Sequence, residues 1–251
     1  MRRHDLINIY KDTIYQCTKV GVSADLKKGS VSTTYKSSLL ADTLAPKFDS
    51  MTVDVINEDT FEAASKFVGT GNVVILNMAS CYAAGGGVKG GAMAQEEELF
   101  RRSNYFVSLS DKFYPLNIGD TIYTPKVTVI KDKTYNMLSV PFTIAAIAAA
   151  ALRKPILTMK GQYYEKDYDA MVIIIDNIFK AAYANNHEIL ILGALGCGAY
   201  GNPPAEVIQI FNKCLQKYWG CFRRVVFAVY SKSKYDVNYT MFKSGIQTKK
   251  I

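Results

Sequence analysis

Two adjacent glutamates behind a glycine-rich loop are the strongest chemical signal in the sequence. Gly85-Gly86-Gly87 is followed, after seven residues, by Gln95-Glu96-Glu97. Successive helical residues project about 100° apart because about 3.6 residues make one turn, so the two carboxylates would take different roles. One can hold a hydroxyl group while the other protonates the oxygen of a bond to be cleaved. Acidic residues in a first helical turn also suit the helix dipole, and Glu98 needs no other explanation.

The first glycine loop follows the apolar run 73–76 and extends from Asn77 to Gly91. Three consecutive glycines are costly to order. They are justified where backbone N–H groups must approach a ligand closely, as in anion-binding nests. A flexible loop remains the alternative explanation for the glycines by themselves.

A second loop has the same order of strand, glycines and helix. It follows the run 189–192 and extends from Gly193 to Glu206. Pro203 and Pro204 are placed to start a helix from Ala205, and free amides ahead of a helix start favour a phosphate. Neither loop has the spacing of a P-loop or of a dinucleotide-binding fingerprint, which argues against a kinase or a dehydrogenase. Two such loops at the carboxyl ends of strands predict a clamped diphosphate.

Three residues in or before the second loop are further candidates for a functional role. Tyr200 closes the loop and could stack on a sugar or a base. Cys197 has no histidine near it in the sequence, so its backbone N–H is the expected contribution and not a nucleophilic thiol. His187, just before a strand, is predicted to lie on the surface.

The composition predicts one domain and an anionic ligand. The chain has 251 residues, of which 49% are hydrophobic, enough for a sizeable core. Lys and Arg number 30 against 22 Asp and Glu, a net charge of +8. This surplus favours a phosphate-bearing molecule or a polyanion, although solubility alone would also account for it.

The sequence argues against a metal site, a membrane-spanning helix and a secreted protein. The five cysteines are irregularly spaced and only two histidines are present, so no zinc site and no cofactor are predicted. The odd cysteine count, with no secretory leader, predicts an intracellular protein of the cytoplasm, or of the nucleus in a eukaryotic or viral-host setting. The apolar segment 144–152 is far shorter than the roughly 20 residues of a membrane span and is predicted to be a buried helix.

The elements that would position these loops alternate along the chain. Strands are predicted at residues 53–56, 73–76, 127–130, 189–192 and 225–229. Helices are predicted at residues 61–67, 95–108, 142–152, 168–184 and 205–218. This alternation predicts an α/β layered sheet that is buried on both faces. Residues 1–50 are less patterned and are expected to form an accessory helix and an irregular or hairpin segment packed on a single domain of residues 1–251.

The glycine and glutamate spacing resembles the signature of the poly(ADP-ribose) glycohydrolases, a branch of the macrodomain superfamily. The microbial-type branch is similar in particular at residues 77–80, 101–104 and 193–204. Weaker similarity continues through residues 51–67, 123–132 and 223–229, so that the resemblance covers nearly the whole chain.

The resemblance implies a three-layer α/β/α macrodomain with a mixed sheet, and cleavage of the ribose-to-ribose O-glycosidic bond of poly(ADP-ribose). By position, it makes Glu97 the catalytic acid, Glu96 the anchor of a ribose hydroxyl and Gln95 the residue that orients the helix start. The implied substrate-binding residues are Asn77, Gly85, Gly86, Gly87, Val88, Gln95, Gly196, Cys197, Gly198, Ala199 and Tyr200. Tyr200 falls where the family usually has an aromatic residue, commonly Phe.

The sequence departs from the family pattern before the glycines, where Ala83-Ala84 replaces the usual Asn-Pro and a side-chain amide and a rigid turn are lost. Leu195 also stands where Trp is common. Two alternatives remain open: removal of single ADP-ribose units from proteins or nucleic-acid bases, and a non-catalytic ADP-ribose reader. The expected partners are therefore ADP-ribose or poly(ADP-ribose) on proteins, with ADP-ribosylated nucleic acid as an alternative. A protein that only binds ADP-ribose does not need Gln95-Glu96-Glu97 behind its glycine loop, so this sequence favours a hydrolase.

Overall fold

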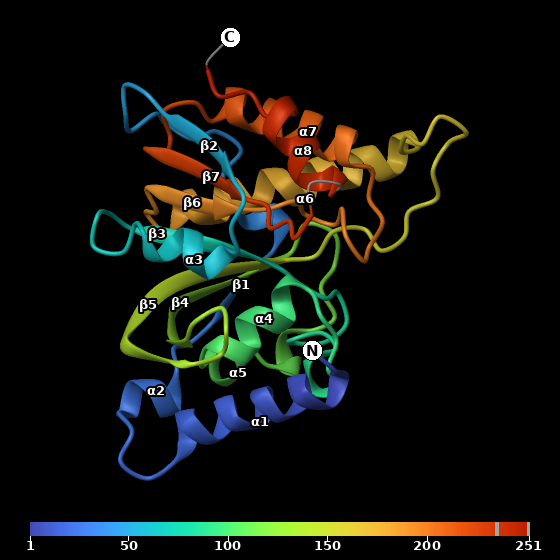
Figure 1. Ribbon diagram of the computed structural model, residues 1–251. Coiled ribbons are helices and arrows are strands. Elements are labelled where there is room, and N and C mark those ends of the chain that lie inside the picture. The colour runs from blue at the N-terminus through green and yellow to red at the C-terminus, as the bar shows by residue number, and fades with distance from the viewer. Residues whose placement is uncertain (234–235, 250–251) are drawn as a thin grey trace.

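A seven-stranded mixed sheet organises the chain, with the strand order β1-β4-β5-β3-β6-β7-β2 (Figure 1). The computed structural model describes residues 1–233 and 236–249. The strands are β1 (Thr33–Tyr35), β2 (Thr52–Ile56), β3 (Val73–Met78), β4 (Thr121–Lys131), β5 (Met137–Ala149), β6 (Ile189–Leu192) and β7 (Arg224–Ala228). The five strands predicted from the apolar runs are all present: β6 has the predicted bounds, β7 is shifted by one residue, and the other three are longer.

The five strands from β5 to β2 run parallel, whereas β1 and β4 are antiparallel to their neighbours. In the centre, Ile75 of β3 pairs with Ala146 of β5 on one side and with Ile191 of β6 on the other. The carboxyl ends of the parallel strands therefore meet at one edge, which is where ligands bind in open α/β sheets.

Helices cover both faces of the sheet and give the expected three-layer α/β/α arrangement (Figure 1). Alternate residues of β3 face opposite layers, since Val74 and Leu76 pack with one core cluster and Val73 and Ile75 with the other. One face carries α6 (Glu165–Ala184), α7 (Pro204–Lys217) and α8 (Val237–Gly245), and the other carries α3 (Thr60–Ser65), α4 (Gln95–Arg102) and α5 (Tyr105–Ser108). No helix in the described part of the chain could cross a membrane.

The predicted helix at 142–152 is wrong, because this segment is the second half of β5 and the turn after it. Alanine favours helices, but here alanines alternate across a central strand. Ala145 and Ala149 pack with the α6–α7 layer, and Ala146 and Ala148 with the opposite one. All four are buried. Small side chains thus let two layers approach the same strand, and this tertiary packing overrides the local preference.

The predicted helix at 95–108 is interrupted. It ends at Arg102, and Ser103 forms an isolated antiparallel bridge with Val129 of β4. The side-chain oxygen of Asn104 then accepts the N–H of Thr128 at 2.7 Å. Ser103 and Asn104 are therefore paired with β4, and the helical conformation resumes only in the four residues of α5.

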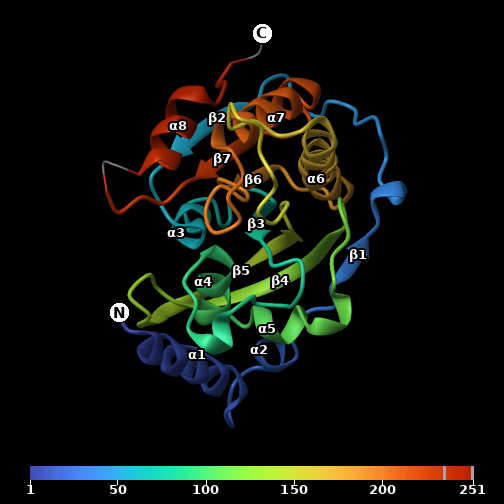
Figure 2. The ribbon, with the colours of Figure 1, turned by 90° about the vertical axis from the view of Figure 1, so that its right-hand side faces the viewer.

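The N-terminal segment contains the expected accessory helix, α1 (Arg3–Thr18), followed by α2 (Ala24–Lys28). No hairpin forms within it, since β1 pairs antiparallel with β4 at the sheet edge. Both views show α1 lying along the outer side of α4 (Figures 1 and 2). The prediction missed α8, which is short and buries Phe242. Short 3₁₀ helices lie at η1 (Ser37–Leu39), η2 (Val88–Gly90) and η3 (Asp111–Phe113).

His187 is buried, so the prediction of a surface residue is wrong. Its Nε2 lies 3.1 Å from the hydroxyl of Tyr123, and the two rings are in contact. Burial lowers the pKa of His187 to about 4, because the charged imidazolium would lose its hydration. The residue therefore belongs to the core at the end of the sheet opposite the glycine loops.

A buried lysine fastens α1 to the rest of the fold. The Nζ atom of Lys131 in β4 pairs with a carboxylate oxygen of Asp12 at 2.6 Å and donates to Thr13 Oγ1 at 2.9 Å. Thr13 in turn donates to the carbonyl oxygen of Arg101, at the end of α4. This contact joins the accessory helix to both the sheet and α4.

Replacing Lys131 by methionine keeps its bulk and removes its charge and donors. We expect the free energy of unfolding to fall by about 2 kcal/mol, the range for hydrogen bonds to charged groups, as measured by urea denaturation. Lys133→Met, at an exposed position two residues on, is the control and should change little. Equal stability of the two variants would show that Lys131 does not hold α1.

Candidate active site

A cavity of about 880 Å³ opens at the carboxyl edge of the sheet. The loops after β2, β3, β5, β6 and β7 all contribute to its wall, together with the first turn of α4. The residues predicted for the site that line it are Gly86, Gly87, Gln95, Glu96, Glu97, Gly196, Gly198, Ala199 and Tyr200. The structure thus brings together both glycine loops and the glutamate pair.

Glu96 is buried and accepts three hydrogen bonds. Its Oε2 accepts the N–H of Ser80 at 2.7 Å, and its Oε1 accepts the N–H of Gly85 and the side-chain amide of Asn77, both at 3.2 Å. Asn77 is fully buried and does not line the cavity; its role in the structure is to donate this hydrogen bond to Glu96. The carboxylate therefore connects the start of α4 to the end of β3 and to the first half of the loop.

Burial raises the pKa of Glu96 to about 7. Loss of hydration is the main cause, and the hydrogen bonds from Ser80 and Asn77 work against it, since they stabilise the charged form. The nearby carboxylate of Glu97 adds to the rise. Glu96 consequently changes its protonation state near neutral pH.

Glu97 is also buried, but it is held by one oxygen only. Its Oε1 accepts the N–H of Gly87 at 2.9 Å. Its Oε2 has no hydrogen-bond partner among the described residues. Since buried polar atoms are nearly always paired, this oxygen marks a place where a further partner is expected.

The glycines are needed because Phe100 and the two carboxylates lie directly against them. Gly86 has a φ of +52°, and a Cβ there would lie 2.7 Å from Glu97 Oε1 and 3.1 Å from Glu96 Oε2. At Gly85, with a φ of +74°, a Cβ would meet the ring of Phe100 at 2.6 Å. Only glycine allows the loop to close over the two glutamates in this conformation.

Gln95 ties the start of α4 to two other elements. Its Oε1 accepts the N–H of Met78 at 2.9 Å, while its Nε2 donates to the carbonyl oxygen of Leu76 at 2.6 Å and to Thr60 Oγ1 at 3.0 Å. The first two contacts lie at the end of β3 and the third at the start of α3. The side chain is therefore placed to orient the helix that carries both glutamates.

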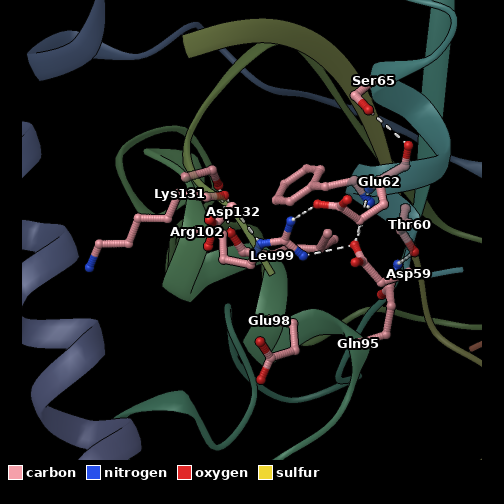
Figure 3. Close-up of polar contacts among 12 residues, drawn as sticks. Asp59, Thr60, Glu62, Ser65, Gln95, Glu98, Leu99, Arg102, Lys131 and Asp132 are labelled. Carbon is pink, nitrogen blue, oxygen red and sulfur yellow. Dashed lines mark hydrogen bonds and ion pairs between the residues drawn. The ribbon is translucent and has the colours of Figure 1, made fainter. Parts of the chain in front are cut away.

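Arg102, at the other end of α4, ties that end of the helix to α3 and was not among the residues predicted for the site. Figure 3 shows its buried guanidinium between two carboxylates, Asp59 at 2.8 Å and Glu62 at 3.1 Å. Asp59 also caps α3 by accepting the N–H groups of Phe61 and Glu62. An Asp before a helical run is a recognisable N-cap signal, but its ion pair with Arg102 depends on the fold.

The backbone amides of the first loop are already occupied. Those of Gly85 and Gly87 bind the two glutamates, Gly86 donates to the carbonyl oxygen of Ala83, and Val88 donates to that of Gly85. The side chain of Val88 is buried in the core. The N–H of Ala84 is held by Asp111 Oδ1 at 2.9 Å, a side-chain contact at the position where the family usually has proline.

The second loop differs, because most of its amides are free. Among the described residues, none accepts a hydrogen bond from the N–H groups of Gly196, Gly198, Ala199 and Tyr200. Such a group of N–H donors forms an anion-binding nest. Cys197 is set back from the cavity: its N–H donates to the carbonyl oxygen of Ala194, and burial raises the pKa of its thiol to about 12.

Two further polar side chains shape the second loop. The hydroxyl of Tyr200 accepts the N–H of Cys81 at 3.3 Å and so links the two loops across the cavity. Buried Asn202, which the sequence interpretation did not single out, donates to the carbonyl oxygens of Gly196 at 3.1 Å and Leu152 at 2.7 Å. It also accepts the hydroxyl of Tyr163 at 2.7 Å.

Solved structures with the same fold include poly(ADP-ribose) glycohydrolases. The enzyme from Thermomonospora curvata superposes with a TM-score of 0.83 at 27% identity, over 95% of this chain and 98% of that one. Its complex with the inhibitor ADP-HPD matches at 28% identity and the same TM-score and coverage. The Deinococcus radiodurans enzyme in complex with ADP-ribose has a TM-score of 0.75 at 26% identity, over 89% of this chain and 97% of that one. No curated protein sequence matches the chain significantly.

Fold and site together define an α/β protein of the macrodomain-like class, with a glutamate pair beneath a glycine-rich loop. The chain belongs to the family of the microbial-type PARG catalytic domain, whose model matches residues 4–132. That match includes the first glycine loop and both glutamates, and it ends before the second loop.

The raised pKa of Glu96 predicts a characteristic pH dependence of stability. A folded-state pKa of about 7 against 4.5 means that the folded protein holds this proton more tightly. The corresponding stabilisation is complete below pH 4.5 and is lost as the pH rises through 7, by about 3 kcal/mol in total. Glu96→Gln cannot titrate, so its stability deficit relative to wild type should shrink from pH 5 to pH 8 in urea titrations. A constant deficit would contradict the shift.

Proposed function

We propose that the protein is an ADP-ribose glycohydrolase that cleaves the ribose-to-ribose O-glycosidic bond of poly(ADP-ribose), with Glu97 as general acid and base. The unpartnered Oε2 of Glu97, in a cavity whose wall also carries the free amides of the second loop, is the observation that carries this proposal. The solved relatives, which are named as glycohydrolases and which bind ADP-ribose or ADP-HPD, support it.

The two loops would bind different parts of ADP-ribose. The free amides of the second loop can bind the diphosphate, because N–H groups in a nest favour an anion. The first loop closes over the glutamates, so the ribose next to the cleaved bond would lie at Glu96 and Glu97. Glu96 then accepts a ribose hydroxyl while remaining held by Ser80 and Gly85.

The reaction balances with one carboxyl group and one water molecule. Protonated Glu97 donates its proton to the bridging oxygen as the bond from that oxygen to the ribose carbon breaks and positive charge develops on the ribose. The leaving adenosine ribose departs with its hydroxyl restored. The Glu97 carboxylate then removes a proton from a water molecule as the water oxygen bonds to the ribose carbon.

Two alternatives were named from the sequence. One is a hydrolase with another leaving group, and the other is a reader that binds ADP-ribose and catalyses no reaction. Release of single ADP-ribose units from protein or nucleic acid would use the same glutamates with another leaving group. A reader would use the nest alone. The extensive support of Glu96 and Gln95 favours hydrolysis over reading, because binding a diphosphate needs neither side chain.

The central test compares wild type with Glu97→Gln, which keeps the shape of the side chain and removes its acid. Wild type should release ADP-ribose from poly(ADP-ribosyl)ated protein, and the variant should be slower by about 10²–10⁴-fold, the usual contribution of general acid catalysis. Calorimetry should find the same ADP-ribose affinity for both within about threefold. Binding without release by the wild type would instead support a reader.

Gly86→Ala tests whether the loop must fit the glutamates. The added Cβ would approach Glu97 Oε1 at 2.7 Å in a backbone conformation unfavourable for alanine, so we expect ADP-ribose release to fall at least 100-fold. The control is Gly90→Ala in the same loop, where a Cβ meets nothing within 4 Å and activity should stay near wild type. Comparable activity of the two variants would argue against a tight loop.

A further inference from the structure

Tyr82 and Arg153 pair on the cavity wall beside the proposed catalytic centre. The guanidinium carbon of Arg153 lies 5.4 Å from the centre of the Tyr82 ring. Tyr82 belongs to the loop after β3, and Arg153 to the segment after β5, the strand next to β3. Both side chains are exposed and both line the cavity, so a ligand can reach them.

Arg153 has no anionic partner in the described part of the chain. Ion pairs with carboxylates are formed by Arg2, Arg101, Arg102, Arg223 and Arg224. Among the described residues, the guanidinium of Arg153 lies over the Tyr82 ring and forms no hydrogen bond or ion pair, which leaves its planar set of N–H donors available. A guanidinium that rests on an aromatic face can still bind phosphate oxygens in a bidentate manner.

The order of strands places Arg153 on the β5 side of the loop that closes over the glutamates. Along the sheet edge the order is β5, β3, β6, β7, β2, with neighbouring strands about 5 Å apart. The first loop follows β3, the free amides follow β6, and the cavity continues past β7 to Asp59 after β2. In the proposed function, ADP-ribose extends from the glutamates below the loop after β3 toward the amides after β6, so the group on the other side of the cleaved bond extends toward β5.

In poly(ADP-ribose) that group is a nucleotide. The leaving oxygen belongs to the ribose of an adenosine, which carries an adenine base and is joined to a diphosphate. An aromatic ring can stack on the base, and an unpaired guanidinium can bind the phosphates. We infer that Tyr82 and Arg153 form a subsite for the next ADP-ribose unit of a polymer; this inference rests on the proposed function.

Backbone hydrogen bonds at Tyr82 and next to Arg153 connect the pair to Glu96 and to the second loop. The N–H of Tyr82 donates to Ser80 Oγ at 3.1 Å, and the N–H of Ser80 binds Glu96. The N–H of Lys154, next to Arg153, donates to the carbonyl oxygen of Tyr200 at 2.8 Å. The subsite is therefore held in position relative to the glutamates and to the second loop, as binding of a defined substrate requires.

The test measures binding in a Glu97→Gln background, where turnover is suppressed. Calorimetry compares ADP-ribose with short, purified poly(ADP-ribose) oligomers. The oligomer should bind at least tenfold more tightly than the monomer. Adding Arg153→Ala should bring this ratio close to one and leave the ADP-ribose affinity within twofold. Tyr82→Ala should act in the same direction, and Tyr82→Phe should keep the preference.

Lys154→Ala is the matched control, because it removes the same charge from the neighbouring residue, whose side chain does not line the cavity. It should preserve the preference for the oligomer. The inference is overturned if the Glu97→Gln protein binds monomer and oligomer equally, or if Arg153→Ala weakens both equally or neither. Failure of the proposed hydrolysis looks different: the oligomer preference persists, but wild type releases no ADP-ribose.

Discussion

The buried carboxylate of Glu96 is the constraint on which the site depends. Placing a carboxylate in a protein interior costs several kcal/mol unless its oxygens are hydrogen bonded. Here Ser80, Gly85 and Asn77 supply the donors, and they come from the end of β3 and from the loop that follows it. The hydrogen bonds that keep Glu96 in place therefore also fix the path of the glycine loop, and with it the oxygen of Glu97 that faces Gly87.

The helix that carries the glutamates has eight residues, too short to be stable alone, so its orientation comes from contacts at both ends. Gln95 joins its start to β3 and α3, and Arg102 joins its end to the cap of α3. Along its outer side, Thr13 of α1 reaches the carbonyl oxygen of Arg101. The N-terminal segment, which is less patterned in sequence than the rest, thus supports the helix that carries the glutamates.

How much the sequence predicts depends on the range of the interaction. The strands around the loops, the two loops and the glutamate pair follow from local patterns, and the family resemblance is confirmed. The alanine-rich second half of β5 could not be recognised, because its conformation depends on two packed layers and not on alanine's own preference. The burial of His187 and the pairing of Arg102 with Asp59 are likewise contacts between distant segments. The roles of individual site residues stay predictions.

The departures from the family pattern gain meaning from the way the two loops differ. The first loop uses its amides to hold carboxylates, so its rigidity comes from Glu96, Glu97 and Asp111 and not from a proline. Ala84 keeps an N–H that proline would lack, and Asp111 binds it. The second loop leaves its amides free, and the hydroxyl of Tyr200, absent from the more usual Phe, ties it to Cys81. At Ala84 a hydrogen bond between segments thus stands where a proline would restrain the turn locally, and at Tyr200 the hydroxyl adds a hydrogen bond that phenylalanine could not form. Together these contacts connect the first loop to Asp111 and to the second loop.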